Sequence, residues 1–302
     1  ISLGLVGSEM CIRDRYNRLF GLETLHPLVS IVNLSEAPRF PTHFTMNYGV
    51  YALFLKNVKC GDIRYGRQTY DYQEGTVTSF APGQVVEVEM QQGVKPNAHG
   101  LLFHPDLIKG TSLGQDIKHY SFFSYTSAEA LHLSEEEKGI FIDCLEKIKM
   151  ELQRPIDKHS KRLISRNIEL LLDYCARFNE RQFITRCEAN KTILHKTDLL
   201  LSKYILSGKL ADGVLPTEEY CADAFHLSPR YFSDLLKFET GKSIHEYFQL
   251  MRLNIAKRML LDKDNTVHMT AKKLGYANVR YFTLLFKKIT GITGAVSYTH
   301  LT

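Results

Sequence analysis

Residues 227–241 read LSPRYFSDLLKFETG, and a similar run, YANVRYFTLLFKKITG, occupies residues 276–291. Identical residues recur at an interval of 50: Arg230, Tyr231, Phe232, Leu235, Lys237, Thr240 and Gly241 return as Arg280, Tyr281, Phe282, Leu285, Lys287, Thr290 and Gly291. The chain therefore contains an internal repeat. Two copies of a helical unit that present Arg, Tyr and Lys beside an apolar row indicate a periodic, anionic partner, and duplex DNA is the obvious candidate.

A short helix is expected before each run. Matching residues recur there at an interval of 49: Ala222, Phe225 and Leu227, then Ala271, Leu274 and Tyr276. A small Ala at the centre of a short helix lets two helices cross at a steep angle, as in a helix-turn-helix unit. Gly275 supplies the second turn, while Ser228 is expected as an N-cap with Pro229 at the first helical position. Because the intervals are 49 and 50, the two turns differ by one residue.

A longer helix is expected between the two units. Ser243 and Glu246 have the spacing of a capping box, and apolar residues follow at three- and four-residue steps: Ile244, Phe248, Met251, Ile255 and Met259. A helix from about Ser243 to Asp262 would be roughly 30 Å long at 1.5 Å per residue. That length is close to the ~34 Å between successive major-groove segments on one face of DNA.

This pair of units resembles the DNA-binding domain of the AraC/XylS family of bacterial transcription regulators. The resemblance extends from about Lys196 to Gly294, and its most specific pieces are residues 227–233 and 274–276. In that family two recognition helices of one polypeptide enter successive major-groove segments. The resemblance implies a sequence-specific transcription regulator, more often an activator than a repressor, that contacts promoter DNA and RNA polymerase.

The resemblance also implies which residues contact DNA. Four side chains in the two recognition helices are expected to face the bases: Arg230, Ser233, Arg280 and Thr283. Three lysines later in the helices are expected at phosphates: Lys237, Lys287 and Lys288. The expected contact set is completed by Ser228, Tyr231, Asn278 and Tyr281. Other interpretations stay open, because a lysine can be a solvated surface charge and several apolar positions fit a buried core better: Tyr231, Phe232, Leu235, Phe282 and Leu285.

The charge distribution supports this assignment. Residues 195–294 hold 15 Lys and Arg against 10 Asp and Glu, and this excess equals the net charge of +5 of the whole chain. Two positions depart from the family, because many members have Arg where this chain has Asp234 and Leu284. An acidic side chain facing phosphates is repulsive, so Asp234 either accepts from a cytosine amino group or points aside. The chain also leaves the family pattern after Gly294.

From Tyr16 to about Tyr125, short alternating runs separated by Gly, Pro and Asn predict β-strands at residues 49–55, 75–80 and 85–89. The order of residues 71–75 and 80–84 resembles the turn-strand-turn of a cupin-type double-stranded β-helix, the usual sensor of this regulator family. The expected fold class is α+β: a cupin-like β-barrel, a helical linker region and an all-α tandem helix-turn-helix domain.

Enzymatic cupins hold a metal through two histidines one residue apart, a glutamate and a distant histidine. The corresponding strand, residues 67–72, reads RQTYDY and contains no histidine. His43, His99 and His104 are scattered, and no set of nucleophile, base and orienting acid stands out. We therefore expect no metal, no cofactor and no catalytic residue, and interpret the barrel as a pocket for a small-molecule effector. Three aromatic residues fit its wall or a plain core equally well: Tyr51, Phe80 and Phe103.

The middle of the chain has helical periodicity. Ser134 and Glu137 form another capping box, followed by an apolar stripe of Ile140, Phe141, Cys144, Leu145 and Ile148. After Pro155 a second stripe contains Leu163, Ile168, Leu171, Leu172, Cys175 and Phe178. Such stripes pack on a neighbour, either a second subunit in a homodimer or the chain's own β-domain.

The expected domains are a β effector domain at 16–130, a helical linker and dimerisation region at 131–190, and the DNA-binding domain at 191–294. Residues 1–15 and 295–302 resemble translated sequencing-adapter sequence, and no functional residue is expected in them. No stretch approaches the ~18 apolar residues of a membrane span. The six cysteines are scattered without a close pair, which favours a reducing cytoplasm over a zinc site or a disulfide framework.

Two other classes of protein stay open. One is a metal-dependent cupin enzyme with an appended DNA-binding module, which the absent histidine pair disfavours. The other is a DNA-repair and adaptive-response protein with the same C-terminal domain. Such proteins carry a closely spaced Cys cluster that this chain lacks.

Overall fold

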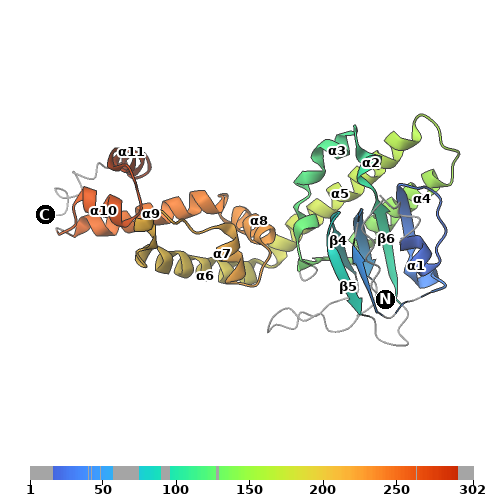
Figure 1. Ribbon diagram of the computed structural model, residues 1–302, viewed down its shortest axis with the longest axis horizontal. Coiled ribbons are helices and arrows are strands. Elements are labelled where there is room, and N and C mark those ends of the chain that lie inside the picture. Colours follow the sequence, from blue (N-terminus) through green and yellow to red (C-terminus); the bar gives the residue numbers. More distant parts are fainter. Residues whose placement is uncertain are drawn as a thin grey trace. The chain divides into compact units, whose positions relative to one another are not determined.

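The computed structural model describes residues 16–39, 41, 43–47, 49–56, 75–89, 96–126, 129–262 and 264–291 of the 302-residue chain. The chain divides into two compact units, Ile1–Thr185 and Arg186–Thr302. The first combines antiparallel strands with helices, and the described part of the second is helical (Figure 1). The fold is therefore a mixture of helix and sheet. None of the described helices has the length and apolar character needed to cross a membrane.

The larger sheet of the first unit is antiparallel, with the order β1 (Val29–Asn33), β6 (Ala98–Phe103), β3 (Tyr51–Lys56), β4 (Thr76–Phe80), β7 (Leu131–His132). A second sheet pairs β2 (His43–Asn47) with β5 (Val85–Glu89). The strands predicted at 49–55, 75–80 and 85–89 are confirmed as β3, β4 and β5. So is the turn after Phe80, where the Gln84 N–H donates to the Ala81 carbonyl at 3.3 Å.

The closed barrel that we expected is not what the described strands form. A barrel closes when its first and last strands pair. In the described residues β1 pairs with β6 alone and β7 with β4 alone, so the larger sheet is open at both edges. The histidine-free stretch at residues 67–72 lies outside the described residues.

Short helices of the first unit are α1 (Arg18–Phe20), η2 (Leu34–Glu36), α2 (Pro105–Ile108), α3 (Ser112–Asp116), η3 (Ile117–His119) and η4 (Ser121–Ser124). Two long helices follow, α4 (Glu135–Leu152) and α5 (Ser160–Thr185), which pack on each other, with α4 against β1 and β6 and α5 against β7. Both helices lie within this compact unit.

The predicted capping box of α4 is present, and the predicted buried stripes are largely confirmed. Leu163 is the error: it is 45% exposed, and Ile164 is buried in its place. The buried row of α5 passes through Ile164, Ile168, Leu171, Leu172 and Cys175. Leu163 precedes that row by one position and turns its side chain to solvent.

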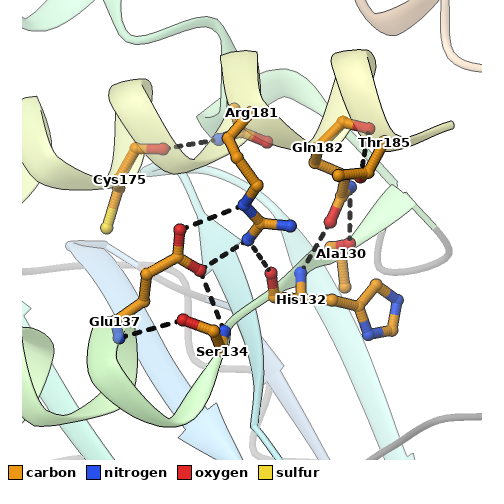
Figure 2. A network of polar contacts seen from close by, with 9 residues as sticks. Ala130, His132, Ser134, Glu137, Cys175, Arg181, Gln182 and Thr185 are labelled. Atoms are coloured by element: carbon orange, nitrogen blue, oxygen red, sulfur yellow. Dashed lines mark hydrogen bonds and ion pairs between the residues drawn. The ribbon is translucent and has the colours of Figure 1, made fainter. Parts of the chain in front are cut away.

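A polar network ties the C-terminal part of α5 to β7 and to the first turn of α4 (Figure 2). The Arg181 guanidinium donates to both carboxylate oxygens of Glu137 and to the His132 carbonyl. Gln182 accepts from the His132 N–H at 2.8 Å and donates to the Ala130 carbonyl at 3.4 Å. Because Glu137 also completes the capping box, one carboxylate satisfies both elements.

The second unit consists of α6 (Cys187–Leu206), η6 (Lys209–Asp212), α7 (Glu218–Asp223), α8 (Pro229–Thr240), α9 (Ile244–Leu261), α10 (Val267–Lys273) and α11 (Val279–Thr290). One buried apolar cluster draws residues from α6, η6 and all five later helices. The predicted connecting helix is confirmed as α9, whose 18 residues make it roughly 27 Å long. It packs on α8 and on α10, and so joins the two helix pairs (Figure 1).

Candidate nucleic-acid interface

The two helix-turn-helix units have matching helix ends. Thr217 and Thr266 are the N-caps of α7 and α10, and each side chain accepts from a backbone N–H three residues on. Ser228 caps α8, with Pro229 at the first position as predicted, and Asn278 caps α11. Both helices have 12 residues and end at a left-handed glycine: Gly241, φ 70°, and Gly291, φ 71°. The sequence repeat is thus a repeat of local structure.

The two turns are closed by equivalent hydrogen bonds. The Leu227 N–H donates to the Ala222 carbonyl at 3.0 Å, and the Tyr276 N–H donates to the Ala271 carbonyl at 2.9 Å. Both alanines are fully buried, as the helix crossing requires. The extra residue of the second turn is Ala277, between Tyr276 and the N-cap.

Equivalent positions in the two turns adopt a left-handed backbone, with φ 57° at His226 and φ 72° at Gly275. A Cβ atom at Gly275 would lie 2.3 Å from the Leu210 carbonyl oxygen. The second turn therefore needs glycine for its backbone conformation and for its close approach to η6.

The exposed face of the first recognition helix, α8, is partly used by its own side chains. Arg230 Nε lies 3.7 Å from Asp234 Oδ2, one turn along the helix. Ser233 Oγ donates to Glu218 of α7 at 3.0 Å. Tyr231 is only 5% exposed, whereas Arg230 and Lys237 face solvent. Of the residues expected to contact DNA from this helix, these two cations are the accessible ones.

The second recognition helix, α11, presents a more open face. Phe282 and Phe286 are buried, and six side chains on other sides of the helix are exposed: Arg280, Tyr281, Leu284, Lys287, Lys288 and Ile289. Tyr281 is 55% exposed, in contrast to Tyr231. Thr283 Oγ1 donates to the Val279 carbonyl at 2.9 Å. The Arg280 guanidinium forms no hydrogen bond or ion pair with another described residue.

A buried arginine of α9 contacts the turn of the second helix-turn-helix. Arg252 is 4% exposed, and its Nε and Nη2 donate to the carbonyl of Leu274, the C-cap of α10. Its Cζ lies 3.9 Å from the centroid of the Tyr276 ring. Burial lowers the pKa of this guanidinium. The helix C-terminus and the ring face stabilise its charge in the absence of water.

The structure thus brings the eleven expected residues onto two equivalent helices and their N-caps. Three residues that shape the two helix-turn-helix units were not predicted from the sequence: Arg252, His226 and Glu218. A sequence signal for His226 did exist. The interval of 49 aligns His226 with Gly275, and a glycine in a turn indicates a left-handed backbone at the equivalent position of the other copy. Arg252 carried no such signal, since a single Arg in a helix is usually solvated.

The three histidines singled out from the sequence lie on different elements of the first unit. His104 is the N-cap of α2, where its Nδ1 accepts from the Asp106 N–H at 3.2 Å, and His99 lies in β6. His43 lies in β2. Among the described residues, no three His, Cys, Asp or Glu side chains gather closely enough to hold a metal ion.

Residues 221–295 match a family described as a helix-turn-helix domain. The HTH-type transcriptional regulator YobQ of Bacillus subtilis is 39% identical over 71 residues, which are 24% of this chain and 30% of YobQ. The bifunctional transcriptional activator/DNA repair enzyme AdaA of the same organism is 38% identical over 79 residues, 26% of this chain and 37% of AdaA. The chain thus covers well under two thirds of these relatives.

A solved structure, the C-terminal domain of AraT, a response regulator from Geobacillus stearothermophilus, is 25% identical, with a TM-score of 0.30 over 36% of this chain and 90% of that one. The family match begins within α7 and runs past the end of α11. Residues 221–295 are therefore a helix-turn-helix domain of the AraC type.

Proposed function

We propose that the chain is a sequence-specific DNA-binding transcription regulator in the cytoplasm. In this proposal α8 and α11 enter successive major-groove segments of promoter DNA, and the first unit binds a small-molecule effector. The observation that carries it is the pair of 12-residue helices, which are both capped by a side chain and joined by α9. Of the two, α11 exposes Arg280, Lys287 and Lys288 opposite its buried phenylalanines. Cations on one face of a recognition helix fit phosphates and guanine edges.

The two helices are proposed to contribute differently. Arg280 is free of carboxylate partners among the described residues, so its guanidinium can reach a guanine without breaking an ion pair. Arg230 must first separate from Asp234. We therefore propose that α11 supplies more base discrimination than α8, with Lys237, Lys287 and Lys288 at phosphates. Ser228 and Asn278 act mainly as N-caps in this proposal.

Selection of bound duplexes from a random pool by the full chain tests the proposal. The expected motif has two segments about one helical turn, ~10 bp, apart. Its affinity should fall steeply with salt, because phosphate contacts release counterions. Enrichment of no sequence would contradict the proposal.

For the first unit we propose the sensor role that a cupin-like domain has in the AraC/XylS family, and no enzymatic role. The relatives' names support regulation, and AdaA, named as bifunctional, matches over 37% of its length only. The network around Arg181 holds the C-terminal end of α5 on β7 and α4 within the first unit. Promoter activation through RNA polymerase belongs to the same proposal.

We also propose a homodimer through α5. Three apolar side chains on this helix are exposed at multiples of seven residues: Leu163, Leu170 and Ile184. A seven-residue apolar spacing is typical of a seam between two helices, and a second copy presents the same seam. Light scattering at tens of micromolar should report a dimer that Leu170→Glu dissociates. A monomer at that concentration would remove this part of the proposal.

A further inference from the structure

The exposed face of α11 carries an apolar side chain among cations. Leu284 is 62% exposed, four residues after Arg280 and three and four residues before Lys287 and Lys288. Residues three and four apart are neighbours on a helix surface. Single exposed leucines are ordinary on protein surfaces. This one lies at the centre of a cationic face, and a partner of that face has to combine anionic groups with an apolar one.

The first helix-turn-helix has a different side chain at the equivalent position of α8. Asp234 occupies the site 50 residues before Leu284, and its carboxylate lies 3.7 Å from Arg230. Leu284 has no carboxylate, so the face of α11 has one negative charge fewer at this position. The Arg280 guanidinium is accordingly unpaired among the described residues. The face of α11 is consequently both more positive and more apolar than the face of α8.

We infer that Leu284 is a specificity-determining residue that packs on the C5-methyl group of a thymine in the DNA segment contacted by α11. The inference rests on the proposed function. Thymine methyls are the apolar groups on the base edges of the major groove, and phosphates flank them on both strands. Leu284 lies about 6 Å along the helix from Arg280, which corresponds to about two base pairs.

This arrangement predicts a composite signal in the α11 segment. Arg280 selects guanine through its N7 and O6 acceptors, and Leu284 selects thymine at a position within about two base pairs. Lys287 and Lys288 neutralise phosphates without reading sequence. The α8 segment, read by a helix with Asp234 in place of Leu284, carries no equivalent dependence on a thymine methyl.

The experiment starts from the motif selected by the full chain. A second selection with Arg280→Ala identifies the α11 segment as the positions whose preference relaxes. Each thymine there is then replaced by deoxyuridine, which pairs identically but lacks the methyl group. We expect one replacement to weaken binding about fourfold, the value of one buried methyl-sized group. Leu284→Ala should bind the thymine duplex about as weakly as the parent binds the deoxyuridine duplex, and should no longer distinguish the two.

Leu199→Ala is the matched control, because Leu199 is an exposed leucine of α6, outside both recognition helices. It should keep the parent's preference for thymine. The inference is overturned if Leu284→Ala keeps that preference, if no thymine in the α11 segment is sensitive, or if Leu284→Ala changes only self-association in light scattering. A motif without a methyl effect would overturn the inference alone. Failure to select any motif would overturn the proposed function as well.

Discussion

The two helix-turn-helix units are alike in sequence and caps but differ in what surrounds their second helices. Phe232 and Phe282 are buried equivalently. Tyr231 and Tyr281 are not, because the first is almost fully buried and the second more than half exposed. The helices around the two tyrosines differ as well, because α8 packs on α6, α7 and α9, whereas α11 packs mainly on α10. Identical residues of a sequence repeat therefore differ in exposure when their tertiary surroundings differ.

The largest expected effect separates the two tyrosines. Tyr231→Ala should lower the free energy of unfolding by about 3 kcal/mol, because it leaves a cavity between α8 and its neighbours. Tyr281→Ala should change it by less than about 0.5 kcal/mol, yet weaken DNA binding. Urea unfolding of both variants measures the difference. Equal losses of stability would break the comparison.

The turns give the next effect. Gly275→Ala should destabilise by about 2 to 3 kcal/mol, since it combines a left-handed backbone with a clash against the Leu210 carbonyl. Gly213→Ala is the control: its φ is 77°, but its Cβ would meet nothing within 4 Å. That variant should lose only about 1 to 2 kcal/mol. His226→Gly should be neutral or slightly stabilising. Similar losses for both alanine variants would show that the contact with η6 is unimportant.

Arg252 anchors the end of α10, and the first helix-turn-helix has no equivalent contact from this residue. Arg252→Met should cost about 2 kcal/mol by leaving the Leu274 carbonyl without its charged donors. Amide hydrogen exchange should accelerate in α10 and α11 more than in α8. Arg258→Met, at an exposed position of the same helix, should stay within about 0.5 kcal/mol of the parent. Equal acceleration of hydrogen exchange in α8 and in α10 and α11 would contradict this assignment.

The smallest effect on stability concerns the acidic residue of α8. Asp234→Asn should change the free energy of unfolding by a few tenths of a kcal/mol, as for other pairs one helical turn apart. Its affinity for all DNA sequences should rise, because a charge that repels phosphates is removed and Arg230 is released. The reciprocal variant, Leu284→Asp, should lower affinity. Titrations at several salt concentrations would expose the opposite result.

The comparison also shows what the sequence can and cannot predict. Caps and turns depend on a few neighbouring residues, so the capping boxes at Ser134 and Ser243, the N-cap at Ser228 and the glycine turn were predictable. Exposure depends on contacts distant in sequence. No local sequence pattern indicates that α6 packs on α8 or that Arg252 is buried. The same holds for the start of the buried row of α5, which is Ile164 and not Leu163. For the same reason the alternating strands predicted a β-domain but not that the larger sheet of the described strands is open at both edges.

The central claim is that base readout and phosphate contact reside on different residues of α11. Binding selection followed by salt titrations of Arg280→Ala and Lys287→Ala tests it most directly. Arg280→Ala should relax the preferred sequence, with a loss of discrimination of about 1 to 3 kcal/mol at one guanine. Lys287→Ala should keep the sequence and make the log-log salt dependence shallower by about one unit. An Arg280→Ala protein with an unchanged preferred sequence and an unchanged margin over random DNA would contradict the account.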